Sequence, residues 1–185
     1  PAATDAVFVT PSHHAPTAAT MPMQRRLELL RLAGERNFVI VEDDYEFEMS
    51  FLKPPSPALK SLDRDGRVLY VGSFSKSLFP GLRLGYLVIR EARALRALML
   101  RHPPGHLQRI VSYFLALGHY DAVIHRMRTE YRRRHEVMAA AIEREGLKVA
   151  GAADFGGSSF WIEGPEGLDA TALMHELRQD GVLIE

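Results

Sequence analysis

The chain of 185 residues contains no cysteine. This absence excludes disulfide bonds, thiolate metal sites and a cysteine nucleophile, and it is typical of a cytoplasmic protein. No apolar run approaches the roughly 20 residues that cross a membrane, so we expect no membrane partner. The 23 basic and 23 acidic residues give a net charge of zero. The overall charge therefore gives no reason to expect nucleic acid as a partner of this chain.

The stretch YVGSFSKSLFPGLRLGY places a lone lysine, Lys76, after the strand-like run Val68–Val71, which we expect to stop at Gly72. The hydroxyls of two serines and a planar guanidinium in this stretch are suited to phosphate. Apolar neighbours and a second cation favour the neutral amine of a lysine, which is its nucleophilic form. The stretch therefore predicts a Schiff-base lysine beside a phosphate, as pyridoxal phosphate requires. An ordinary lysine in a surface loop is the alternative. The phosphate-binding candidates are Ser73, Ser75 and Arg83.

A second apolar run, Phe38–Val41, ends in an acidic group followed by Tyr45. Ligands of open α/β sheets bind at the carboxyl ends of strands. A carboxylate there can keep the pyridine nitrogen of pyridoxal phosphate protonated. Asp43 is our candidate for this carboxylate. A helix cap or a set of metal ligands is the alternative interpretation of the acids.

The runs TPSHHAPTAATMP, IVEDDYEFE and SFSKSLFPGLRLGY together resemble the aminotransferase-like domain of the MocR type of GntR-family bacterial transcription regulators. The resemblance covers nearly the whole chain. It implies the fold of type I pyridoxal-phosphate aminotransferases, and a winged helix-turn-helix domain, outside this chain, that binds DNA. It also implies a homodimer and an amino acid or amine as the effector.

The same resemblance assigns roles to individual residues. Lys76 would be joined to the cofactor, Asp43 would face its pyridine nitrogen and Tyr45 its phenolic oxygen. His13 would belong to a loop that runs over the cofactor ring. In this loop the chain departs from the family pattern, because Ala18 replaces a glycine and His14 a glutamine. Ser73, Ser75 and Arg83 would hold the phosphate.

We predict an α/β fold: the later half of the large domain over 1–118, with a mostly parallel sheet, and then a long helix and a small α+β domain over 119–185. We expect Trp161 in the small domain's core, and His102 and His106 in a loop. The expected strands are 7–9, 38–41, 68–71, 84–89, 147–150, 158–163 and 182–184, and the expected helices are 22–36, 92–101, 121–145 and 169–179.

Two segments allow two interpretations each. The Pro-rich stretch 47–57 contains Phe51 and Leu52, which we expect to form a dimer contact, although packing against the core is the alternative. The run Arg132–Arg134 predicts a solvated helix face or pairing with acids of another subunit rather than a nucleic-acid site. The pair His13 and His14 has no third ligand at a suitable spacing, so we expect no metal site.

Three functions follow from these residues. The favoured one is an effector-sensing, pyridoxal-phosphate-binding domain of a transcription regulator. The second is an aminotransferase that moves an amino group between an amino acid and a 2-oxo acid. The third is an interaction module without cofactor chemistry. By the family pattern the chain is a fragment that lacks a Gly-rich phosphate loop and the arginine that grips the substrate carboxylate. We therefore expect weak or no cofactor binding by the chain alone.

Overall fold

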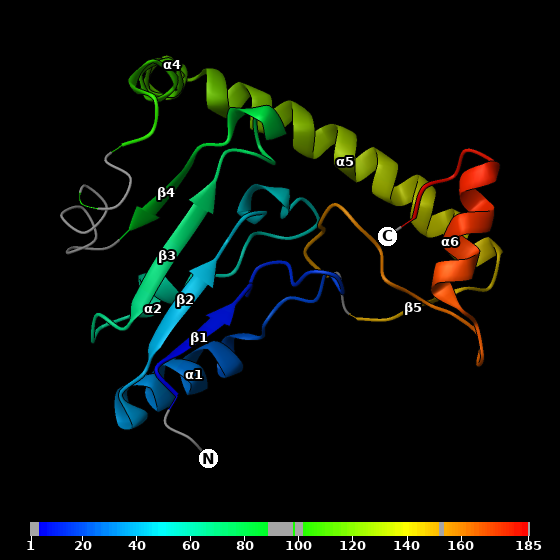
Figure 1. Cartoon of the computed structure of the whole chain (residues 1–185), viewed down its shortest axis with the longest axis horizontal. Coiled ribbons are helices and arrows are strands. Elements are labelled where there is room, and N and C mark those ends of the chain that lie inside the picture. Colours follow the sequence, from blue (N-terminus) through cyan, green and yellow to red (C-terminus); the bar gives the residue numbers. More distant parts are fainter. Residues whose placement is uncertain (1–3, 89–97, 99–101, 152–153, 185) are drawn as a thin grey trace.

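A four-stranded sheet forms the first part of the molecule in the computed structural model, which describes residues 4–88, 98, 102–151 and 154–184. The strand order is β1–β2–β3–β4. The first three strands are parallel and β4 is antiparallel to β3. The parallel strands therefore end at one edge of the sheet, where β4 begins (Figure 1). This confirms the mostly parallel α/β fold. The strands are Ala6–Val9, Val39–Asp43, Val68–Ser73 and Gly85–Val88.

Helix α1, Met23–Arg36, connects β1 to β2 as predicted. Pro22 precedes its first turn, where a missing N–H costs nothing. Asn37 ends the helix with a left-handed φ of 56°, and its N–H donates to the carbonyl of Ala33. The helix returns the chain to the start of the sheet, which allows β2 to run parallel to β1.

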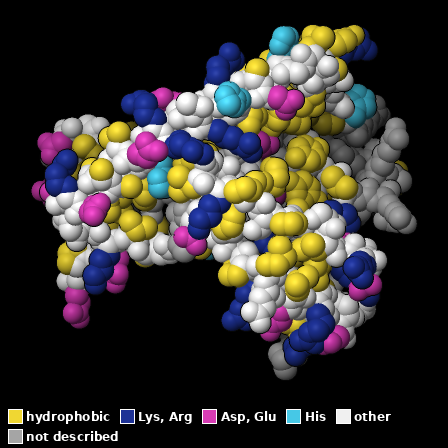
Figure 2. Space-filling model, turned by 180° about the vertical axis from the view of Figure 1, so that it is seen from behind, with side chains coloured by type: hydrophobic (Ala, Val, Ile, Leu, Met, Phe, Trp, Pro, Cys, Tyr) yellow, Lys and Arg dark blue, Asp and Glu magenta, His cyan; other side chains and the backbone are white. Residues whose placement is uncertain are grey.

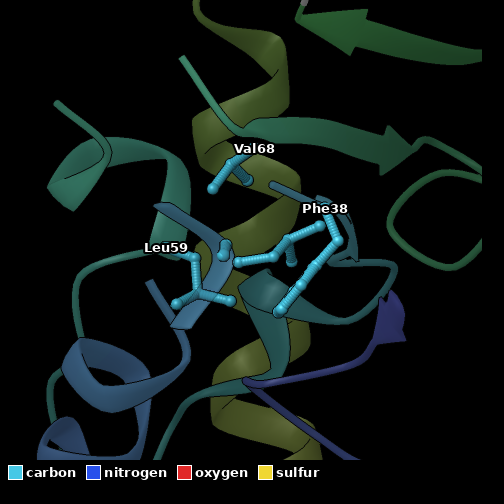
Figure 3. Close-up of a cluster of buried hydrophobic side chains, with 5 residues drawn as sticks. Phe38, Leu59 and Val68 are labelled. Carbon is cyan, nitrogen blue, oxygen red and sulfur yellow. The ribbon is translucent and has the colours of Figure 1, made fainter. Parts of the chain in front are cut away.

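The main core lies between the sheet and the helices α1 and α2, the latter spanning Leu59–Leu62. Figure 3 shows that the side chains of Phe38, Leu59 and Val68 point toward one another. Ile40 is the register partner of Val68, so both side chains lie on the same face of the sheet. With Ala33, these residues form one buried cluster, which fixes the sheet on which the site is built.

Two helices lead away from the sheet. Helix α4, Gly105–Ala116, packs Val111 against Leu82 and Leu84. Gly118, with φ 72°, separates α4 from the 26-residue helix α5, His119–Arg144. In Figure 1, α5 runs from the sheet to the C-terminal elements. The predicted long helix is confirmed, and the predicted helix 92–101 lies mostly outside the described residues.

His106 lies in the first turn of α4, so our loop assignment was wrong for this residue. The reason is that Pro104 ends the loop and its carbonyl accepts the N–H of Gln108, which starts the helix. His102 remains in the loop before the helix.

The C-terminal part is a two-stranded sheet and one helix. Strands β5, Lys148–Val149, and β6, Ile162–Glu163, pair antiparallel. Helix α6, Ala170–Gln179, starts at Asp169, whose side chain accepts from the N–H groups of Thr171 and Ala172. This confirms the helix predicted from residue 169.

Two predictions for this part were wrong. Trp161 is 40% exposed rather than in a core. Residues 182–184 form no strand, and the strand expected over 158–163 is limited to its last two residues. The physical reason is that no residue of the described range 158–184 is buried, so there is no core to which Trp161 or a third strand could add. The proposed division at residue 118 stays a prediction. Among the described residues, no helix is long and apolar enough to span a bilayer.

Candidate cofactor site

The predicted site residues lie at the edge where the parallel strands end. One candidate residue follows β1, and two lie at the end of β2 or just after it. Three lie at the end of β3 or just after it, and the last precedes β4. Asp43 is the register partner of Val71, and Ser73 is that of Gly85, so the groups from neighbouring strands emerge side by side. This is the edge at which open α/β sheets bind ligands. In chain order, the residues are His13, Asp43, Tyr45, Ser73, Ser75, Lys76 and Arg83.

The loop after β1 places His13 in the interior. Its side chain is 3% exposed, and its Nε2 lies 3.2 Å from the Ser50 hydroxyl. Burial lowers the pKa of His13, while the charges of Glu46 and Asp44 act in the opposite direction. The Tyr45 hydroxyl donates to the His13 carbonyl at 3.2 Å. Burial also raises the pKa of Tyr45 to about 12, so its phenol keeps its proton and can donate.

Arg26 holds this loop in place, a role that the sequence patterns did not reveal. The side chain is fully buried in α1 and donates to the carbonyls of Pro11 at 2.8 Å, Pro57 at 2.9 Å and Met21 at 3.0 Å. These three carbonyls belong to three separate segments. A single guanidinium therefore joins the loop before His13, the start of α1 and the segment before α2.

The acids at the end of β2 and directly after it have different environments. Glu42 is fully buried and accepts from the N–H groups of Leu59 at 2.7 Å and Lys60 at 2.8 Å. The helix-cap alternative is therefore correct for Glu42, which caps α2. Asp44 is also buried and accepts from the Tyr70 hydroxyl at 3.1 Å. The side chain of Asp43 is half-buried, and burial and the charge of Asp44 raise its pKa. A cationic partner would stabilise its ionised form.

The loop after β3 presents Lys76 in an environment that differs from our expectation. Its side chain is 55% exposed, and its Nζ lies 3.6 Å from the carboxylate of Glu46. More than half of the side chain is exposed, which differs from the apolar surroundings that we expected, and the Schiff-base role of Lys76 stays a prediction. Glu46 itself is 5% exposed. Glu46 belongs to the same acidic stretch as Asp43. Its negative charge was the sequence signal that could have indicated this partner of Lys76.

The phosphate-binding candidates form few hydrogen bonds or ion pairs with other described residues. The Ser73 Oγ accepts from the Ser75 N–H at 3.1 Å, which orients this hydroxyl and leaves its own hydrogen free to donate. Arg83 has a left-handed φ of 48° and an exposed side chain. Within the described ranges, no ion pair or hydrogen bond involves its guanidinium.

Gly72 lies inside β3 rather than at its end, which corrects the predicted boundary. A Cβ atom at this position would lie 2.2 Å from Cζ of Tyr86, its register partner. Only glycine therefore allows the Tyr86 ring to cross the strand here. The ring centroid of Tyr86 lies 5.4 Å from that of Phe74 and 6.1 Å from that of Tyr70. These aromatic rings support the loop that carries Lys76.

Several buried polar atoms near this edge have no partner among the residues that the structure describes. Buried polar atoms normally form hydrogen bonds, so such atoms indicate a ligand or water. Together with the half-buried Asp43 and the exposed Arg83, they fit a group that has a cationic ring nitrogen and a phosphate. The residues present therefore fit pyridoxal phosphate. The atoms are Ser12 Oγ, His13 Nδ1, Asp44 Oδ1 and Ser77 Oγ. The described residues contain no group of three or more potential metal ligands.

The segment after β2 packs against α5. Its 3₁₀-helical turn η1 spans Phe47–Met49. Phe51 is 3% exposed, and its ring centroid lies 5.6 Å from that of His135 and 6.4 Å from that of Tyr131. Packing against the core, the alternative interpretation, is therefore correct for Phe51, whereas Leu52 is 38% exposed.

The three arginines at 132–134 in α5 make two different kinds of contact. Arg132 donates to the Phe51 carbonyl and so holds this segment. Arg133 and Arg134 pair with Glu130 on the same helix, and their side chains are 66% and 68% exposed. The predicted solvated face is confirmed for these two residues.

Comparisons with known proteins agree with this geometry. The family model "Aminotransferase class I and II" matches residues 1–185, so the chain belongs to this family. Over its whole length, the chain is 59% identical to the HTH-type transcriptional regulator TauR of Rhodobacter capsulatus, of which it covers 39%. It is 38% identical over 75% of its length to a probable rhizopine catabolism regulatory protein, MocR, of Rhizobium meliloti, of which it covers 29%.

Among solved structures, the chain is similar to a kynurenine aminotransferase of Pyrococcus horikoshii. The TM-score is 0.86 at 31% identity, over 97% of this chain and 46% of that one. The resemblance to MocR-type regulators and the aminotransferase fold are thus confirmed, and this family implies dependence on pyridoxal phosphate. The chain spans less than half the length of each of these relatives.

Proposed function

We propose that this chain is the cofactor-binding, effector-sensing part of a MocR-type transcription regulator. In the whole protein, an N-terminal winged helix-turn-helix domain would bind DNA, and two copies would form a homodimer. The effector would be an amino acid or another amine. An effector acts by binding one conformation better than another, and the difference in affinity sets the response.

Each candidate residue would bind a different part of the cofactor. Pyridoxal phosphate, when bound, supplies an aldehyde for amines and an electron sink. Lys76 would hold the cofactor through its amine, and Asp43 would accept from the protonated ring nitrogen. Tyr45 would donate to the phenolic oxygen, which its retained proton allows. His13 would lie over the ring as a neutral imidazole. The phosphate would accept from Ser73, Ser75 and Arg83.

One observation carries this proposal: residues from four separate segments meet at one sheet edge in a chain that is 59% identical to a transcription regulator. An aminotransferase is the second candidate, because the similarity to the kynurenine aminotransferase covers nearly the whole chain. Both candidates use the same residues. The stronger similarity to TauR favours the regulator.

The test is the visible absorbance of the full-length protein with pyridoxal phosphate, measured beside Lys76→Ala and Lys76→Arg. We expect an absorbance band that both variants lose, because neither offers a reactive amine. Borohydride treatment followed by peptide mass spectrometry should place the cofactor's mass on Lys76. Identical spectra for all three proteins would overturn the cofactor assignment.

Adding amino acids then separates the two candidates. A sensor should shift its spectrum and its DNA affinity without forming 2-oxo acid. Steady release of 2-oxo acid would favour the aminotransferase.

A further inference from the structure

Glu46 joins Lys76 to a segment near the C-terminus. Its Oε1 lies 3.6 Å from Lys76 Nζ, and the same oxygen accepts from the hydroxyl of Ser158 at 2.5 Å. The two partners are separated by 82 positions in the sequence, so a single buried carboxylate connects two distant parts of the chain.

The segment that carries Ser158 is docked beside this contact. Gly157 donates its N–H to the Met49 carbonyl at 3.1 Å, and Leu52 donates to the Phe155 carbonyl at 3.1 Å. Gly156 forms an isolated bridge with Ser50. The segment 155–158 therefore lies against the stretch that follows β2, and Glu46 stands at the start of that stretch.

The charge of Lys76 has a direct effect on this contact. A carboxylate that is 5% exposed is costly to leave without a cation. Burial lowers the pKa of His13 and so disfavours its cationic form. Asp43 at the end of β2 and Asp44 directly after it are acids, so none of these three residues replaces the lysine. Among the described residues, Lys76 is the one cation in an ion pair with Glu46.

We propose that Glu46 is a positioning residue that holds the side chain of Lys76 through their ion pair and couples it to the docking of segment 155–158. If Lys76 is joined to the cofactor, a step that rests on the proposed function, its Nζ is drawn away from the 3.6 Å contact with Glu46 and the segment loosens. The state of the lysine is thus transmitted to the C-terminal part of the chain.

The first test measures the reactivity of Lys76 without any cofactor. Formaldehyde and cyanoborohydride methylate free amines, and peptide mass spectrometry reports each lysine separately. We expect Glu46→Gln to speed the methylation of Lys76 about two- to fivefold near neutral pH, as for loss of a partly exposed ion pair. Lys53 and Lys148 in the same sample serve as internal references. An unchanged rate at Lys76 would overturn the ion pair.

The second test measures hydrogen exchange at the backbone amides of Gly157 and Leu52. We expect faster exchange in Lys76→Ala, because the buried carboxylate loses its cation. Lys76→Arg keeps the charge and should exchange like the wild type. Equal exchange in both variants would overturn the coupling. Because neither variant forms the covalent link to a cofactor, this outcome is independent of whether the proposed function holds.

Discussion

Glu42 combines complete burial with two backbone hydrogen bonds to the start of α2. Burial raises the pKa of its carboxyl, while the N–H groups of Lys60 and Leu59 and the charge of Arg26 act in the opposite direction. A raised pKa means that the folded protein binds the proton more tightly than the unfolded chain. The resulting stability is present below the ordinary pKa of 4.5 and is lost as the pH rises through the folded-state value.

We therefore expect Glu42→Gln to change both the stability and its dependence on pH. At pH 4 the variant should be less stable by about 1–3 kcal/mol, because one buried N–H loses its acceptor. Between pH 4 and pH 7 it should lose less stability than the wild type, because it lacks the titrating group. Urea unfolding at both pH values measures the two effects.

Glu28→Gln on the exposed side of α1 is the control, and it should change stability by no more than about 0.5 kcal/mol. A variant that shows the same pH slope as the wild type would contradict the explanation.

The positions of the candidate site residues near strand ends could be predicted from sequence, whereas their partners within the protein could not. Asp43 and Tyr45 come soon after the apolar run Phe38–Val41, and Lys76 comes soon after the run Val68–Val71, so local patterns place all three near strand ends. Glu46 reaches a serine 112 positions away, and Arg26 binds carbonyls up to 31 positions away. Such contacts depend on how the loops meet in space, which no local pattern records.

At the scale of single elements, the C-terminal end of α1 stores conformational strain. Asn37 adopts φ 56° and lies exposed between the helix and the core residue Phe38. Asparagine tolerates this left-handed conformation better than most residues, but glycine has no penalty there. The position therefore favours glycine over every residue with a Cβ atom.

We expect Asn37→Gly to raise the unfolding free energy by about 0.5 kcal/mol, since it removes the strain. Asn37→Val should lower it by about 1–2 kcal/mol, because a β-branched side chain is poorly accommodated at positive φ. Urea unfolding of the wild type and the two variants measures their free energies of unfolding. A glycine variant that is less stable than the valine variant would refute the assignment of the cap.

Elements with a strong local pattern could be predicted, and those that depend on a core could not. The β1–α1–β2 unit and α5 have continuous apolar periodicity, and both were found. The C-terminal segments have short apolar runs as well, but no residue in the described range 158–184 is buried. Short strands of this kind need a packed face before they form.

At the scale of the whole molecule, the sheet has an apolar and unpaired edge. Tyr86, Leu87 and Val88 of β4 are 42%, 47% and 46% exposed, and β4 pairs only with β3 within the described part of the chain. Figure 2 shows hydrophobic side chains gathered in broad areas of one face of the molecule. An exposed apolar edge strand of this kind is a template for pairing with another chain.

We predict that the 185-residue chain forms dimers or higher oligomers through this edge. Leu87→Lys places a charge on it and should shift the chain toward the monomer, because burying an unpaired charge in an interface is costly. Gln24→Lys adds the same charge to the exposed face of α1 and should leave the assembly unchanged. Size-exclusion chromatography with light scattering measures the masses. A well-folded wild-type monomer would contradict the prediction. Equal assembly of Leu87→Lys and the wild type would place the interface elsewhere, since a charge at the centre of β4 disfavours any pairing that buries it.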